Sequence, residues 1–328
     1  MKVSVCIVAY NEEDYLEDLL KCINRQTYDH KLMEILLIDS MSTDRTLEIM
    51  QSFVEDDLFY NVRILMNPRQ IQAAGWNIAI DNFSGEVMIR LDAHATVPDD
   101  FVERNIHNLK TEDVSGGQRP CIVERTTPWK STLLIAENAL FGSGIAPFRR
   151  DTGKHYVKTM FHPAYKREVF DRVGHFDEKL LRTEDNDMNY RIRKAGYKLF
   201  YDPEIISYQH IRNNLRRLVK QKYRNGYWVG LTLGYQPKCL SIYHLIPFAF
   251  IIAIICSITL VSIEITLPMY LLIGTYSAVN ILMSLVAVLH EKTSIFFIAL
   301  PFLFLLLHLS YGIGSLIGLI YLPVWRLK

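Results

Sequence analysis

The stretch from Val3 to Asp39 reads VSVCIVAYNEEDYLEDLLKCINRQTYDHKLMEILLID and decides the fold class. It opens with the apolar run VSVCIVA and closes with MEILLID, and both runs are typical of strands buried on both faces. Between them, apolar residues recur at helical spacing: Tyr15, Leu16, Leu19, Leu20 and Ile23. The stretch therefore predicts a strand–helix–strand unit.

The same alternation continues along the chain. STDRTLEIMQSFV (42–54) and QIQAAGWNIAIDNF (70–83) have helical periodicity, and each is followed by a short apolar run, VRILMN (62–67) and EVMIRLD (86–92). Strands that alternate with helices predict an α/β fold with a doubly wound, mostly parallel sheet.

Polar residues follow three of these strands directly. Tyr10 and Asn11 follow the first strand, Asp39 ends the second, and Asp92 ends the fourth. Ligands of doubly wound sheets bind beyond the carboxyl ends of the strands, so these residues predict a binding site. The chain has neither GxGxxG after the first strand nor GxxxxGK[ST] anywhere, which removes the main support for a dehydrogenase or a P-loop enzyme. A nucleotide bound here would need a metal on its diphosphate, and Asp92 offers oxygen ligands.

The bulk composition excludes several other classes of protein. Half of the residues are hydrophobic, 22% are charged and the net charge is +1, which gives no sign of nucleic-acid binding. The five cysteines lie far apart and form no CxxC pair. This pattern argues against a zinc site or a disulfide framework and fits a reducing compartment.

The C-terminal part of the chain is almost wholly apolar. Three runs, about 240–263, 267–289 and 295–322, have the length of membrane-crossing helices. A buried helical core domain is the alternative. Three crossings would put Arg326 on the far side of the membrane, against the positive-inside rule, so the last run is a candidate for a re-entrant or interfacial segment.

A basic segment precedes the apolar part. No acidic residue occurs between 205 and 238, and basic residues recur every four positions in one stripe: Arg212, Arg216, Lys220 and Arg224. This pattern predicts an interfacial amphipathic helix on an anionic leaflet and the mixed, charged half of the chain on the cytoplasmic side of the cell membrane. We expect an α/β domain with the binding site at 1–207, the interfacial region at 208–239 and about three transmembrane helices at 240–328.

Four motifs in order resemble one family. VSVCIVAYNEEDYLEDLL, LLIDSMSTDRT, IRLDAHA and TEDNDMNYRIRKAGYKLFYDP are similar to the opening strand, the V-D-D-G-S-T-D motif, the D-x-D motif and the E-D-x-D-L-x-x-R region of family-2 glycosyltransferases. The resemblance covers about residues 2–230 and implies the GT-A fold and an inverting mechanism. LDAHA, FGSGIAPFR and the apolar tail look closest to the branch that assembles succinoglycan and similar exopolysaccharides.

The resemblance implies roles for residues around the donor. Asp39 would contact the base or ribose, and further donor-binding residues would be Tyr10, Asn11, Asp44, Arg90 and Asp92. For Asp44, a plain helix cap is the alternative.

The metal site departs from the family. Asp92, His94 and His210 are the expected ligands of Mn²⁺ or Mg²⁺, but His94 stands where the family has the last Asp of D-x-D. Manganese accepts imidazole more readily than magnesium does. Alternatively, Asp92 alone anchors the metal and His94 bonds a phosphate, or His94 is a turn residue without a ligand.

The E-D pair carries the expected chemistry. The resemblance assigns the general base to Asp185, beside Glu184, in the first turn of a helix that begins near Thr183. The helix dipole favours the charged form of both carboxylates there. Residues expected near the acceptor or diphosphate are Asp187, Arg191, Gln221 and Arg224, with Arg149 or Arg150 on a lipid pyrophosphate. Gln221-x-x-Arg224-Asn225 lacks the Trp of the Q-x-x-R-W motif of processive members, which argues against processive synthesis.

Taken together, these features predict a metal-dependent, multi-pass membrane glycosyltransferase. It would move a sugar from a nucleotide-sugar donor, a UDP-sugar first, to a lipid-linked saccharide in exopolysaccharide or cell-surface polysaccharide synthesis. Two alternatives stay open: a polyprenyl-phosphate sugar transferase, in which the lipid phosphate itself attacks, and a non-catalytic nucleotide-binding membrane scaffold.

Overall fold

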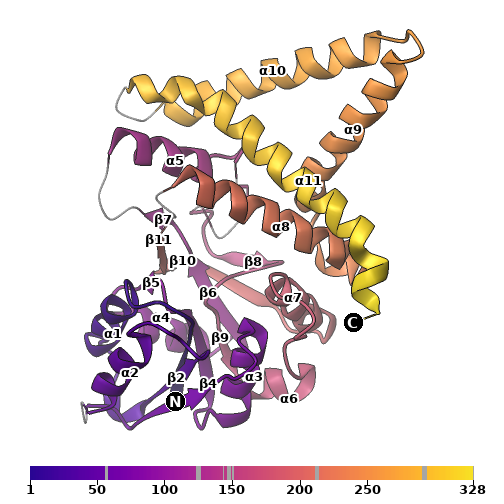
Figure 1. Ribbon diagram of the computed structural model, residues 1–328. Coiled ribbons are helices and arrows are strands. Elements are labelled where there is room, and N and C mark those ends of the chain that lie inside the picture. The colour runs from indigo at the N-terminus through magenta and orange to yellow at the C-terminus, as the bar shows by residue number, and fades with distance from the viewer. Residues whose placement is uncertain are drawn as a thin grey trace. The chain divides into compact units, whose positions relative to one another are not determined.

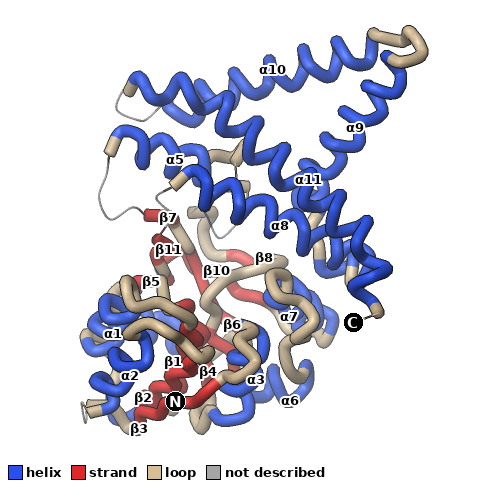
Figure 2. Tube along the Cα trace, viewed as in Figure 1, coloured by secondary structure: helices blue, strands red, loops and turns tan. Residues whose placement is uncertain are grey.

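The computed structural model describes residues 1–55, 58–122, 127–142, 144–145, 149, 151–210, 214–289 and 294–327. The chain divides into two units. Unit 1 is Met1–Pro120 with Pro147–His210, and unit 2 is Cys121–Ala146 with Ile211–Lys328. Unit 1 is an α/β structure, whereas unit 2 is helical apart from the short strand β7, Cys121–Ile122 (Figure 2).

An eight-stranded sheet forms the centre of unit 1, in the order β3-β2-β1-β4-β9-β6-β10-β8. The neighbours from β3 to β4 are parallel, as is the pair of β6 and β10, while β9 and the edge strand β8 run antiparallel. The strands are β1 (Val3–Ala9), β2 (Met33–Asp39), β3 (Asn61–Met66), β4 (Val87–Asp92), β6 (Val114–Gln118), β8 (His155–Val157), β9 (Ala164–Lys166) and β10 (Leu199–Ile206). The mostly parallel α/β sheet predicted from the sequence is confirmed.

Helices cover this sheet (Figure 1). They are α1 (Leu16–Asn24), α2 (Thr46–Val54), α3 (Gln72–Asn82), α4 (Phe101–Asn108), α6 (Arg167–Val173) and α7 (Glu184–Lys194). Residues of α1, α2 and α4 pack on the odd-numbered side chains of β1, such as Ile7. Gly75 of α3 lies against Val8 and so marks the opposite face. Because both faces are covered, every residue of β1, β2 and β4 is buried, which explains their continuous apolar runs.

The register aligns the strand ends that carry polar residues. Ala9 pairs with Asp39, and Val8 pairs with Asp92. Side chains alternate between the faces of a strand, so Arg90 and Asp92 share the α3 face of β4. A small antiparallel pair, β5 (Ala95–Thr96) and β11 (Tyr208–His210), follows this edge.

Unit 2 consists of α5 (Pro128–Asn138), α8 (Leu215–Tyr235), α9 (Ile246–Val261), α10 (Leu267–Val288) and α11 (Leu300–Arg326). Three segments are long and apolar enough to cross a membrane: Ile242–Val261, Leu267–Val288 and Ile295–Arg326. They match the three apolar runs predicted from the sequence. The described part of the last run is helical throughout, since a 3₁₀ turn, Ile295–Ala299, leads directly into α11.

The segment 121–146 belongs to unit 2. Its described part contains α5, which packs with the C-terminal helices in one apolar cluster of unit 2. Leu133 and Ala136 of α5 meet Leu303 and Phe304 of α11 in this cluster. Unit 2 is therefore built from two pieces of chain that are far apart in the sequence.

Candidate active site

A loop network follows the ends of β1 and β2. Asn11 has a positive φ of 54°, and its Oδ1 accepts a hydrogen bond from the backbone N–H of Thr43 at 2.8 Å. Asp39 is fully buried, and its carboxylate accepts from the N–H of Ser42 at 3.1 Å. Asp44 caps the start of α2 by accepting from the N–H of Thr46 at 3.0 Å. Together these bonds order a turn at the strand ends, beside which Tyr10 is 49% exposed.

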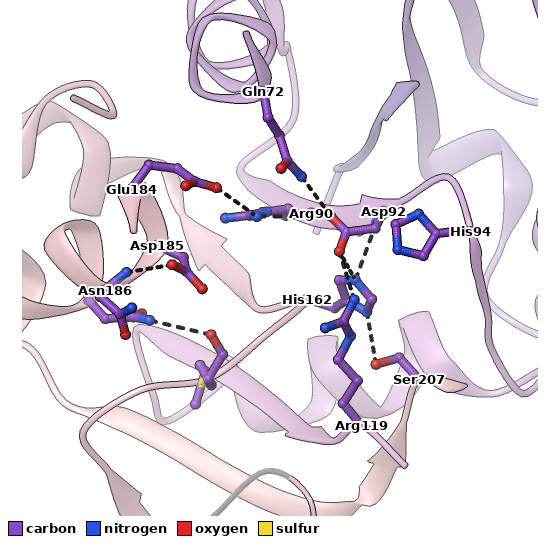
Figure 3. A network of polar contacts seen from close by, with 12 residues as sticks. Gln72, Arg90, Asp92, His94, Arg119, His162, Glu184, Asp185, Asn186 and Ser207 are labelled. Atoms are coloured by element: carbon purple, nitrogen blue, oxygen red, sulfur yellow. Dashed lines mark hydrogen bonds and ion pairs between the residues drawn. The ribbon is translucent and has the colours of Figure 1, made fainter. Parts of the chain in front are cut away.

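Asp92 lies at the centre of a buried polar network (Figure 3). Its Oδ2 accepts from the Arg119 guanidinium at 2.9 Å and lies 3.0 Å from Nε2 of His162. Its Oδ1 accepts from the amide of Gln72 at 3.2 Å. Burial works to raise the pKa of Asp92, but His162, Arg119 and Arg90 outweigh it and hold that pKa well below its usual range. Asp92 is therefore a carboxylate whose oxygens already have protein partners.

Arg90 connects this network to the E-D pair. Its Nη2 lies 3.9 Å from Oδ1 of Asp92 and 3.7 Å from Oε1 of Glu184. The guanidinium lies over the rings of Trp76, at 4.6 Å, and Phe176, at 5.5 Å. The aromatic faces, the Asp92 carboxylate and the Glu184 carboxyl group together compensate for the burial of this cation.

His162 extends the network to the other side of Asp92. Its Nδ1 lies 2.9 Å from the hydroxyl of Ser207. Burial lowers the pKa of His162 to about 4, although Asp92 works against that shift. The ring is therefore neutral near pH 7, so it donates from one nitrogen only and accepts at the other.

No sequence pattern pointed to Gln72, Arg119, His162 or Ser207. Arg119 follows β6, whose carboxyl end lies in the same sheet, so the strand-end rule would have found it had β6 been recognised. The glycines of VSGGQ obscured that strand, because glycine is depleted in strands. His162 is a single histidine in a loop, and no pattern marks it.

Glu184 and Asp185 are buried in the first turn of α7, behind the N-cap residue Thr183, as predicted. Their ionisation differs from the expectation. Burial, reinforced by Asp185, raises the pKa of Glu184 to about 8, and burial also raises the pKa of Asp185. Desolvation therefore outweighs both the helix dipole and the attraction of Arg90. The site combines a carboxylate that stays charged, Asp92, with two carboxyls that hold protons more tightly than usual.

Of the three predicted metal ligands, Asp92 belongs to this network and the two histidines lie beside it. Nδ1 of His94 lies 3.1 Å from Oε1 of Glu12. Tyr208 pairs with Thr96 and Gln209 with Ala95, so continuing this antiparallel register by one residue places His210 opposite His94. The His210 ring also lies 5.5 Å from that of Tyr15. Among the residues that the structure describes, no three His, Cys, Asp or Glu side chains gather closely enough to hold a metal by themselves.

The other predicted site residues have mainly structural contacts. Asp187 accepts from Nε of Arg191 at 2.7 Å, and Arg191 also donates to the backbone carbonyls of Val173 and His175. These contacts tie α7 to the end of α6. Gln221 and Arg224 lie in unit 2 on α8, where Arg224 is exposed.

Three further basic residues were named from the sequence: Arg149, Arg150 and Arg212. Arg149 is a half-buried residue between undescribed neighbours. Arg150 and Arg212 lie outside the described residues.

The family comparison assigns a class to this mostly parallel sheet, with its carboxylates at the strand ends and its E-D helix. The chain belongs to Glycosyl transferase family 2, whose profile matches residues 4–174. It is thus a glycosyltransferase with a GT-A type core followed by apolar helices.

Two curated relatives extend this comparison. The chain is 28% identical over 328 residues to the dolichyl N-acetyl-alpha-D-glucosaminyl phosphate 3-beta-D-2,3-diacetamido-2,3-dideoxy-beta-D-glucuronosyltransferase of Methanococcus voltae, and the match covers 97% of both chains. It is 30% identical over 202 residues to the succinoglycan biosynthesis protein ExoA of Rhizobium meliloti (strain 1021), covering 60% of this chain and 59% of that protein.

A solved structure shares the fold. The mannosyltransferase PcManGT of Pyrobaculum calidifontis, determined in complex with GDP-Man and Mn²⁺, matches with a TM-score of 0.64 at 18% identity. The match covers 96% of this chain and 87% of that chain. At this identity the likeness establishes the fold.

Proposed function

We propose that this glycosyltransferase is a membrane-anchored, inverting enzyme. It transfers one sugar from a UDP-sugar to a saccharide carried on a polyprenyl phosphate or diphosphate, in the synthesis of a cell-surface polysaccharide or glycan. The observation that carries the proposal is the buried pair Glu184 and Asp185, joined by Arg90 to Asp92 at the strand ends.

Asp185 is the general base in this proposal. Inversion requires one base that takes the proton from the attacking acceptor hydroxyl. A buried carboxyl with a raised pKa is a stronger base than a solvated one, and Asp185 meets this condition. Arg90 and Arg119 contribute positive charge on the donor side, while Asp92 holds both guanidinium groups in place.

A divalent cation is part of the proposal, with His94 and His210 as its protein ligands. A metal-bound histidine commonly donates a hydrogen bond from its other ring N–H to a carboxylate. Glu12 is placed to accept such a bond from Nδ1–H of His94. Asp92 fits this role less well, because its oxygens already accept from Gln72 and Arg119. The cation, when bound, neutralises the leaving diphosphate, and the imidazole ligands favour Mn²⁺ over Mg²⁺.

The lipid-borne acceptor is supported by two observations. Unit 2 provides three segments of membrane-crossing length. The relative that matches along nearly the whole chain is named for its action on a dolichyl phosphate-linked sugar. A basic α8 on the cytoplasmic leaflet would hold the catalytic unit near such an acceptor.

Ligand-induced stabilisation of the detergent-purified protein tests the donor site. A ligand that binds only the folded state raises the melting temperature. We expect UDP, in the presence of Mn²⁺, to raise it more than GDP or CDP do. If none of the nucleotides changes the melting temperature with or without metal, the proposed donor site is wrong.

A further inference from the structure

The helices α8 and α11 are in backbone contact along parallel paths. Gly226 and Gly230 of α8 face the carbonyls of Tyr311 and Ser315, and Gly318 of α11 faces the carbonyl of Tyr227. A Cβ atom at any of these glycines would overlap the partner's backbone. Both residue numbers rise together along the contact, so the two helices run in the same direction.

This contact continues to both ends of α8. At its start, Leu218 packs with Leu303 and Leu307 of α11 in one apolar cluster. At its end, Arg326 donates to the carbonyl of Gly234. The two helices therefore run side by side in the same direction over nearly the whole length of α8. In a membrane, both would lie at the same depth.

The charge of α8 excludes a membrane crossing for this helix. Its first three turns expose four basic residues to the surroundings: Arg216, Arg217, Lys220 and Arg224. Each such charge at the centre of a bilayer costs at least about 2.5–3.5 kcal/mol. Because α11 runs alongside α8 in the same direction, the same argument excludes a path across the bilayer for α11.

The outward face of α11 agrees with an in-plane position. Its exposed apolar residues from the middle onward form one helical stripe: Ile313, Ile317, Ile320 and Val324. The three candidate spans differ in how much of their most apolar 18-residue stretch is buried. In the segment of α11, 28% of that stretch is buried inside the structure, against 11% in each of the other two segments. Thus α9 and α10 expose apolar residues widely, as crossing helices do, whereas α11 exposes one side.

Aromatic side chains gather where α8 and α11 end. The Trp325 ring lies 5.3 Å from that of Tyr235 and 6.4 Å from that of Trp228, and the rings of Tyr227 and Tyr321 are 6.3 Å apart. Trp and Tyr are enriched at the membrane–water boundary. Both helix ends therefore have the composition of the interface and not of the bilayer centre.

We propose that α8 and α11 form one two-helix platform that lies in the interface of an anionic leaflet, so that α9 and α10 alone cross the membrane. The basic stripe of α8 binds anionic headgroups, and the apolar stripe of α11 enters the acyl boundary. Two crossings return the chain to its starting side. Arg326 then lies on the same side as α8, which satisfies the positive-inside rule.

Spin-label depth measurements test this platform, which rests on the membrane anchoring proposed above. Single cysteines carrying a nitroxide are placed at Ile313, Ile317, Ile320 and Val324 of the full-length protein, with Cys256→Ser, in vesicles that contain phosphatidylglycerol. We expect nearly equal depths, because an in-plane helix keeps one face at one level. A crossing helix would spread these depths over about 16 Å, and that result would overturn the platform.

Labels on α10 provide the matched control. Leu267, at the start of α10, and Val279, near its middle, should differ in depth by about 13 Å if α10 crosses the bilayer. Labels exposed to water at both positions would overturn the membrane anchoring, and the platform with it. If the label depths differ along α10 and also along α11, both helices cross the bilayer. That result would overturn the platform but not the membrane anchoring.

Labelling with a membrane-impermeant maleimide gives a second, independent readout. Leu327→Cys and Lys220→Cys should react in vesicles of the same orientation, and Glu264→Cys, between α9 and α10, in vesicles of the opposite orientation. If Leu327→Cys reacts together with Glu264→Cys, the chain crosses three times and the platform is wrong.

Discussion

Arg90 lies 3.7 Å from Glu184, yet the pKa of Glu184 is raised to about 8. Burial and the neighbouring Asp185 outweigh this cation, so the folded protein holds a proton that the unfolded chain has released. The contribution of Glu184 to stability is therefore fullest below the ordinary carboxyl pKa of about 4.3. It falls as the pH rises toward 8.

Glu184→Gln should remove this pH dependence. The variant and the wild type should have similar melting temperatures near pH 4, because both then carry a neutral side chain. Between that pH and 8, the free energy of unfolding of the variant should rise relative to that of the wild type by up to about 1.4 kcal/mol per pH unit. Thermal unfolding over this pH range measures the difference, and parallel curves for the two proteins would contradict the raised pKa.

Asp185→Asn should lower kcat by about 100- to 10,000-fold while nucleotide binding is retained, because a general base contributes in that range. Asp187→Asn, in the same helix turn, should mainly lower the melting temperature, because Asp187 pairs with Arg191. A lipid phosphate that attacks directly needs little base catalysis. A small effect of Asp185→Asn with a polyprenyl phosphate acceptor would thus favour the sugar–lipid transferase alternative.

His94→Ala should abolish the Mn²⁺-dependent part of nucleotide binding. Glu12→Gln should weaken metal affinity by about 10- to 100-fold, since it removes the carboxylate behind the imidazole. At Mn²⁺ concentrations that still load the variant, the electron spin-echo signal of ¹⁴N coupled to bound Mn²⁺ should weaken in His94→Ala, because only the His210 nitrogen remains. An unchanged nitrogen signal would exclude His94 as a ligand, and Gln72→Ala serves as a control that frees an oxygen of Asp92 instead.

Gly318→Leu should separate α8 from α11 and lower the melting temperature by several degrees, because a side chain there meets the backbone of Tyr227. Gly274→Leu is the matched control, since Gly274 of α10 has no neighbour within 4 Å of a Cβ atom. Equal melting temperatures of the two variants would show that the close helix contact is dispensable.

Lys222 and Glu137 form a buried ion pair between α8 and α5, with Nζ to Oε2 at 2.8 Å. Lys222→Met should destabilise the protein by about 3–5 kcal/mol, because it leaves Glu137 charged and buried. Adding Glu137→Leu should restore most of the loss. Lys220→Met, on the exposed side of α8, should change stability by about 0.5 kcal/mol or less.

The first four parallel strands and their helices could be predicted because burial on both faces produces apolar runs, as at 5–9 and 87–89. The E-D helix was also predictable, since Thr183 and two acidic residues mark its start. The partners of Asp92 were not, because Arg119 and His162 come from irregular segments and only the tertiary fold brings them to one carboxylate. The pKa directions at Glu184 and Asp185 depend on burial, which no local pattern reports.

The pairing of α8 and α11 shows a similar limit. Gly226, Gly230 and Gly234 are spaced four residues apart, as are Gly314 and Gly318, and this small-residue spacing suits close helix packing. The spacing by itself does not identify the partner helix. The basic residues Arg216, Lys220 and Arg224 are exposed on a helix, as the sequence predicted, and Leu218 on another face of α8 packs on α11.

The insertion of α5 into unit 2 has a consequence for biosynthesis. Leu133, Ile135 and Ala136 of α5 are made long before Leu303 and Phe304, with which they share one apolar cluster. A ribosome must therefore complete the last helix before α5 can bury its apolar side, and a nascent chain carries this exposed segment throughout elongation. For the same reason, a chain cut after residue 210 would keep α5 without its packing partners. A soluble catalytic fragment requires that residues 127–142 be replaced by a short polar linker.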